Sequence, residues 1–136
     1  MKIFICASKY NYGYVPDIKK ELEKMGHVIT VPNSFDDPMK ENKVKELGIK
    51  EHSKWKGDMI RLQKTKVIAN DCILVLNFDK NGQKNYIGGA TFLEIFQAFD
   101  LGKKVYLYNP IPESNFKDEL IGMDVQVING DLSLIV

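Results

Sequence analysis

One carboxylate placed shortly after a glycine pair is the feature of this chain best suited to chemistry. The run 85–94 (NYIGGATFLE) follows a strand-like stretch and a polar loop, and it opens an apolar helix. Gly88 and Gly89 let backbone N–H groups approach a ligand closely, and the N-terminus of a helix favours oxyanions. Glu94 is the only charged side chain between residues 85 and 99. This combination predicts chemistry on a sugar or a phosphate.

Glu94 also has a purely structural interpretation. Thr91 and Glu94 have the spacing of a capping box, in which Glu94 would accept a hydrogen bond from the Thr91 backbone N–H. Four bulky side chains form one face of the expected helix: Phe92, Ile95, Phe96 and Phe99. The opposite face carries Glu94 together with Ala90, Thr91, Gln97 and Ala98. That second face is suited to solvent, to a subunit interface or to the wall of a pocket, and spacing alone favours the cap.

The composition excludes several classes of function. A chain of 136 residues predicts one domain spanning 1–136, and 44% hydrophobic with 27% charged residues is ordinary for a globular protein. The net charge of +1 provides no field for recruiting a nucleic acid polymer or an anionic membrane. No apolar run is long enough to span a membrane and no secretory signal precedes the first strand, so we expect a cytoplasmic protein.

The cysteines and histidines do not indicate a metal site. Cys6 and Cys72 lie in apolar, strand-like runs, where reduced core cysteines are common. His27 and His52 have no neighbours at metal-ligand spacing. We therefore expect neither a metal nor another cofactor.

Strand-like runs alternate with helical patterns along the chain. The expected strands are 2–7, 28–31, 72–77, 104–109 and 125–128. The expected helices are 17–25, 55–70, one ending near 102, and 115–121, while the polar segment 33–52 is interpreted mainly as an insertion over the sheet edge with a short helix around 43–47. This alternation predicts a three-layer α/β domain, flavodoxin-like or Rossmann-like, with a five-stranded, mainly parallel sheet of order 2-1-3-4-5. Ligands bind such sheets beyond the carboxyl ends of strands one and three, where the loops 7–14 and 77–89 meet.

Motifs along most of the chain resemble the nucleoside 2-deoxyribosyltransferase-like superfamily, which includes the deoxyribosyltransferases and the 2′-deoxynucleoside 5′-phosphate N-hydrolases. The resemblance comprises the first strand with Ser8, Asp58 on the second long helix, and the Asn-Asp pair 70–71 before the third strand. It continues with Glu94, six residues after Gly88, and a following Gly-Lys-Lys-Val. The chain is most similar to a branch with a Tyr-Ile-Gly-Gly-x-Thr-Phe-Leu-Glu signature and an Asn-Pro-Ile-Pro segment.

The resemblance implies that Glu94 is a nucleophile. It would attack C1′ of a ribose or deoxyribose and displace the base, leaving a glycosyl-enzyme ester for water or a second base to resolve. Asp58 would contact the sugar or assist proton transfer to the departing base. The remaining implied contacts to the sugar and phosphate come from Ser8, Tyr10, Tyr12, Gly88 and Gly89.

The chain departs from the superfamily pattern at Gly88. The transferases carry an acidic residue at this position and the nucleotide hydrolases carry a serine. The side chain that handles protons or binds phosphate in those enzymes is therefore missing at this position, or its role is taken by Asn85, Tyr86 or Thr91. Near Ser8, only Lys9 supplies a positive charge. Because the acidic residue of the transferases is absent, hydrolysis is expected rather than base exchange.

Simpler interpretations exist for most of the implied site. Asp58 has the spacing of a surface ion pair with Arg61. Ser8 is suited to capping a turn, and Tyr10 and Tyr12 to packing on the surface. A nucleotide-binding or sensing module without turnover is therefore the alternative function. A third candidate is a phosphoribohydrolase, but the chain matches only part of the Pro-Gly-Gly-x-Gly-Thr-x-x-Glu motif of those enzymes.

The expected partner is a small nucleoside or nucleotide. The superfamily's sites are completed by a neighbouring subunit, so the resemblance also implies a homodimer or a higher homo-oligomer. The small-residue face that carries Glu94 would suit close packing of helices between subunits.

Overall fold

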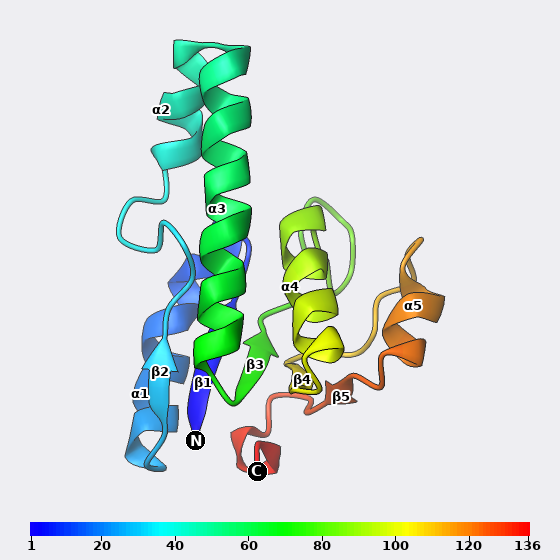
Figure 1. The fold of residues 1–136 in the computed structure, drawn as a ribbon. Helices are drawn as coiled ribbons and strands as arrows, with labels where there is room; N and C mark the ends of the chain where they lie inside the picture. Colours follow the sequence, from blue (N-terminus) through cyan, green and yellow to red (C-terminus); the bar gives the residue numbers. More distant parts are fainter.

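A computed structural model describes all 136 residues as an α/β domain built on one five-stranded sheet (Figure 1). The strand order is β2-β1-β3-β4-β5, and every neighbouring pair is parallel. The strands are β1 (Lys2–Cys6), β2 (Val28–Thr30), β3 (Cys72–Val75), β4 (Lys104–Leu107) and β5 (Gln126–Val127). The predicted fold class and strand order are confirmed.

Helices cover both faces of the sheet. They are α1 (Val15–Lys24), α2 (Lys40–Leu47), α3 (Ile49–Ala69), α4 (Gly89–Asp100) and α5 (Lys117–Gly122), with 3₁₀ helices η1 (Lys9–Tyr14) and η2 (Leu132–Leu134). Helix α1 packs on the face that carries Ile3 and Ile5. Helices α3, α4 and α5 pack on the other face, which carries Phe4 and Cys6. Consecutive residues of β1 thus enter opposite cores, which explains why its sequence is continuously apolar.

The polar segment 33–52 contains the short helix that was expected around 43–47, which is α2, but this helix forms a hairpin with a longer α3 than expected. Helix α3 begins at Ile49, six residues before the expected start, and Gly48 turns the chain from α2 into α3 with a φ of 128°. The hairpin extends past the carboxyl ends of the strands (Figure 1). Val44 is the only buried side chain of α2, so no apolar stripe announces the helix. None of the helices is both long and apolar enough to cross a membrane.

Helix α4 corrects two expectations. It begins at Gly89 with Gly88 as its N-cap, so Thr91 already lies in the first turn and the capping box with Glu94 is wrong. The face of small residues is buried inside the domain, since Thr91, Glu94 and Ala98 are all buried. It is therefore not available to another subunit. The exposed side carries Phe96 and Phe99, which are 50% and 46% exposed.

Candidate active site

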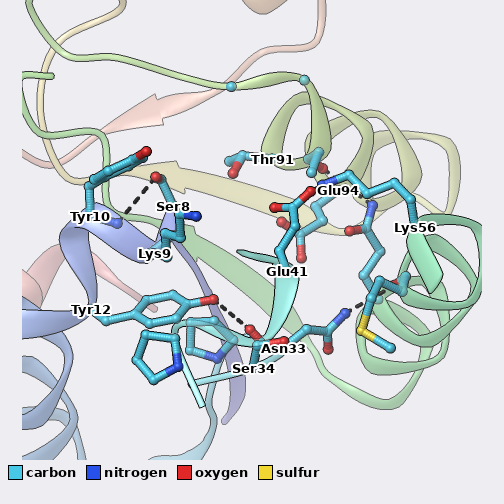
Figure 2. A pocket seen from close by; sticks show the side chains of 18 of the residues that line it. Ser8, Lys9, Tyr10, Tyr12, Asn33, Ser34, Glu41, Lys56, Thr91 and Glu94 are labelled. Carbon is cyan, nitrogen blue, oxygen red and sulfur yellow. Dashed lines mark hydrogen bonds and ion pairs between the residues drawn. The ribbon is translucent and has the colours of Figure 1, made fainter. Parts of the chain in front are cut away.

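A hollow of about 330 Å³ lies beside the segment that follows β1. It is enclosed by η1, the segment after β2, the α2–α3 hairpin and the start of α4, whose side chains converge on it (Figure 2). Seven of the eight site residues expected from the sequence line this hollow: Ser8, Tyr10, Tyr12, Gly88, Gly89, Thr91 and Glu94. The fold therefore assembles them at the switch point of the sheet, where open α/β domains bind ligands.

Glu94 is the buried acid of this hollow. Only 7% of the residue is exposed, although its side chain contributes to the lining. Burial raises the pKa of the Glu94 carboxyl to about 8, while a hydrogen bond with Cys6 and the charge of Lys66 act in the opposite direction. The protonated form of the carboxyl group is therefore favoured at neutral pH.

Cys6 and Lys66 are the two groups that act on the Glu94 carboxyl besides its burial. Burial raises the pKa of the Cys6 thiol well above its ordinary value, so Cys6 remains a neutral thiol. The Lys66 ammonium donates a hydrogen bond to the Val31 carbonyl at 3.0 Å and lies 5.7 Å from the centroid of the Phe4 ring. Burial lowers the pKa of Lys66, and the charge of Glu94 opposes that change.

Tyr12 is a fixed hydrogen-bond donor at the wall of the hollow. Its hydroxyl donates to the Asn33 carbonyl, and its ring packs edge-on against Phe35. Burial raises the pKa of Tyr12 to about 12, with smaller contributions from Glu94 and Glu41. The phenol is therefore never ionised at physiological pH.

Ser8 and Tyr10 take part in local structure and also line the hollow. The Ser8 hydroxyl accepts a hydrogen bond from the Tyr10 backbone N–H at 3.4 Å, so it caps η1 as the simpler interpretation expected. Both residues also line the hollow. Tyr10 is largely exposed and lies beside Ser8 (Figure 2).

The glycine pair opens α4 toward the hollow. No side chain caps this helix, so the first backbone N–H groups of α4 have no partner within the helix. A Cβ atom at Gly88 would lie 3.4 Å from the Tyr86 ring, whereas one at Gly89 would meet nothing within 4 Å. A Cβ atom at either position would thus make at most an ordinary van der Waals contact, at Gly88 with Tyr86.

The structure does not bring Asp58 to the hollow. Its carboxylate pairs with Arg61 at 3.1 Å, and its side chain is 53% exposed. Met59 and Gln63 of the same helix line the hollow instead. Gln63 lies five positions after Asp58 on α3, which corresponds to about 140° around the helix axis. The surface ion pair is the interpretation that the geometry supports.

Gln63 is the site residue that the sequence analysis missed on α3. It is 4% exposed, and its side-chain amide donates to the Ala90 carbonyl at 3.2 Å. A signal for it existed, because Gln63 is a polar residue four positions before Val67, on the buried stripe of the helix.

The helical hairpin contributes a second carboxylate that was also missed. Glu41 lines the hollow and lies 2.8 Å from Nε2 of His52 and 3.2 Å from Nζ of Lys56. Burial alone would raise the pKa of Glu41, but the hydrogen bonds with His52 and Lys56 outweigh it and hold the pKa below its ordinary value. The hollow thus combines an ionised Glu41 with a protonated Glu94.

No protein-family model matches the chain, and no curated protein matches it. The functional conclusion therefore depends on the fold and on the chemistry of this hollow.

Proposed function

We propose that the protein hydrolyses the N-glycosidic bond of a nucleoside or a nucleoside 5′-monophosphate, with Glu94 as the nucleophile. The observation that carries this proposal is the buried Glu94 carboxyl lining a hollow at the switch point of the sheet. A cavity of about 330 Å³ lies within the range of small-ligand sites.

The proposed reaction has two steps. The ionised Glu94 attacks C1′, and the bond between C1′ and the base nitrogen breaks, with the electron pair and a proton from the medium leaving on the base. Water then adds to C1′ and gives a proton to the medium, the bond between C1′ and the Glu94 oxygen breaks to return the carboxylate, and the free sugar or sugar phosphate departs. An oxocarbenium-like transition state is stabilised by a nearby anion, and this supports a carboxylate as the reacting group.

The surroundings of Glu94 suit a sugar and a base. Tyr10, Tyr12 and Trp55 provide aromatic surfaces for stacking, and they line the hollow together with the amide side chains of Asn33 and Gln63. Aromatic and amide groups recognise the face and the edge of a base by stacking and by hydrogen bonding.

Hydrolysis is preferred to base exchange in this proposal. The resemblance to the deoxyribosyltransferases breaks down at Gly88, where those enzymes carry an acidic residue, and Asp58 lies outside the hollow. The other carboxylate of the hollow, Glu41, is already paired with His52 and Lys56, so no unpaired second acid is in position to manage protons for an incoming base, whereas water needs less assistance.

A binding or sensing module is the second candidate. The protonated state of Glu94 at neutral pH favours it, because a neutral carboxyl group is a poor nucleophile. Such a module would retain a nucleotide without breaking it.

We also propose that the protein forms a homodimer or a higher homo-oligomer through the exposed side of α4. Leu93, Phe96 and Phe99 repeat every third residue and are all exposed. Exposed apolar side chains that gather on one helix face are typical of interaction surfaces.

The function is tested by incubating the protein with ribonucleosides, deoxyribonucleosides and their 5′-monophosphates, and by measuring the free base chromatographically. Release of base that is abolished in Glu94→Gln and retained in Glu46→Gln would support the hydrolase. Glu46 is an exposed acid of α2 outside the hollow, so it is a matched control. Saturable nucleotide binding without base release would favour the sensing module.

A further inference from the structure

Four lysines line the hollow: Lys9, Lys45, Lys56 and Lys80. Lys56 pairs with Glu41, whereas no ion pair of the structure includes any of the other three. The four lysines outnumber the two carboxylates that line the hollow, Glu41 and Glu94, so the hollow carries a net positive charge even when both acids are ionised. The chain as a whole has a net charge of only +1, so this excess is local and indicates an anionic ligand.

Lys80 is held at the hollow by aromatic rings. Its Nζ lies 4.3 Å from the centroid of the Tyr10 ring and 4.6 Å from that of Tyr86. Rings of this kind attract an ammonium group without neutralising it. The N–H donors of Lys80 therefore remain available to a ligand.

The loop after β3 fixes the backbone of Lys80. Lys80 and Gln83 exchange two backbone hydrogen bonds of 2.9 and 2.8 Å. Asn81 and Gly82 between them have φ values of 48° and 78°, as a type I′ turn requires. Lys80 thus projects from a rigid two-residue hairpin, which reduces the entropy lost when it binds.

Lys9, at the start of η1, also lies near the Tyr10 ring. Its Nζ lies 5.6 Å from the Tyr10 centroid and donates a hydrogen bond of 2.8 Å to Oδ1 of Asn42, which is a neutral group. Two ammonium groups without carboxylate partners are thus gathered around Tyr10. Ser8 and the uncapped start of α4 line the same hollow.

We propose that Lys9 and Lys80 bind a phosphoryl group on the sugar of the substrate, so that the protein acts on a nucleotide in preference to a free nucleoside. This inference rests on the proposed function. Two ammonium groups match the double negative charge of a phosphate monoester, and hydrogen bonds between ionised groups are among the strongest in proteins. Only Lys9 is a basic residue close to Ser8 in the sequence, but the fold brings Lys80, 72 positions after Ser8, to the same hollow.

The subsite is tested by titration calorimetry with 2-deoxyribose 5-phosphate, 2-deoxyribose and inorganic phosphate, which need no knowledge of the base. Lys9→Met and Lys80→Met remove the charge and keep the apolar stem, and Lys84→Met is the control. Lys84 lies in the same loop as Lys80 but outside the hollow, where it faces Asp79 at 3.8 Å. Thermal unfolding of each variant verifies that it is folded.

We expect the wild-type protein to bind the sugar phosphate at least about tenfold more tightly than the sugar, and each of the two variants to lose most of that preference. Lys84→Met should bind like the wild type. Equal affinity for the sugar and its phosphate overturns the inference, as does an equal loss in all three variants. Tighter binding of inorganic phosphate than of the sugar phosphate also overturns it, because the site would then recognise the free ion.

Base release separates this inference from the proposed function. Equal kcat/KM for nucleosides and their 5′-monophosphates would overturn the phosphoryl subsite and leave the hydrolase standing. Phosphate-dependent binding without any base release would support the subsite and overturn the hydrolase.

Discussion

Gln63 of α3 is tied to Ala90 of α4 by a hydrogen bond of 3.2 Å, four residues before Glu94. This bond joins the two helices at the wall of the hollow, so the position of Glu94 depends on α3. Replacing Gln63 with leucine removes this bond, while the Ala90 carbonyl keeps its partner within α4, the Glu94 backbone N–H, and the loss of one such bond costs roughly 0.5–1.5 kcal/mol. We expect Gln63→Leu to lower the free energy of unfolding in urea by that amount and to reduce kcat/KM for base release. Lys64→Leu, at the exposed neighbouring position, is the control and should change neither quantity.

The state of Glu94 predicts how activity depends on pH. A nucleophilic carboxylate must be ionised, and the pKa of Glu94 is about 8. Below that pH, kcat/KM should therefore increase about tenfold for each pH unit and then level off. A profile measured from about pH 5.5 to 9 tests this expectation, with Glu46→Gln as the reference variant. Activity that falls over the same range would mean that Glu94 acts in its protonated form, and the nucleophile would have to be sought elsewhere.

The raised pKa of Glu94 also makes the stability of the fold depend on pH, and stability should decrease with rising pH where activity increases. The carboxyl group titrates near 4.5 in the unfolded chain and near 8 in the folded one, so the folded state retains its proton more tightly. The resulting stabilisation is complete below about pH 4.5 and is lost as the pH rises through 8, by at most roughly 5 kcal/mol.

Glu94→Gln cannot ionise and isolates this effect. The free energy of unfolding of the variant, relative to that of the wild type, should increase between about pH 5 and pH 8. Urea unfolding at the two pH values measures it. A constant difference would show that Glu94 titrates normally and is in contact with water.

The strands of the sheet could be predicted from the sequence, whereas the α2–α3 hairpin, which forms one wall of the hollow, could not. Strands such as β1 and β3 are buried on both faces, and their continuous apolar runs identified them. Their alternation with helices, together with right-handed crossovers, predicted the strand order. The α2–α3 hairpin is held largely by polar contacts such as Glu41 with His52, which leave no apolar period to detect.

Glu94 could be found from the sequence, but its surroundings could not. Its isolation on an apolar helix marked it as unusual, whereas its burial depends on which face of α4 meets the sheet. The expected bulky face is divided by the fold, because Ile95 is fully buried whereas Phe96 and Phe99 are exposed, and Glu94 is buried beside Ile95. Lys80 reaches the hollow only through the turn at Asn81, so no local pattern indicated it.

Asp58 provides a test of where the resemblance to the superfamily fails. The resemblance assigns it a role at the sugar, whereas the geometry gives it an exposed ion pair with Arg61. Exposed pairs of this kind contribute roughly 0–1 kcal/mol, so Asp58→Asn should leave both stability and base release close to the wild-type values. A loss of activity in Asp58→Asn with folding intact would restore it to the site, supplied to a neighbouring subunit's hollow.

Self-association through α4 predicts a specific effect of charge on its exposed side. Phe96 is 50% exposed in the isolated domain, and it lies between Leu93 and Phe99 on that side. Burying a carboxylate without a partner is strongly unfavourable, so Phe96→Glu should convert an oligomer into monomers without unfolding the domain. Light scattering after size-exclusion chromatography measures the mass. Met25→Glu is the control, because Met25 is similarly exposed but follows α1, which packs on the opposite face of the sheet. A wild-type protein that remains monomeric at high concentration, or a Met25→Glu variant that dissociates equally, would contradict the assignment of the interface to α4.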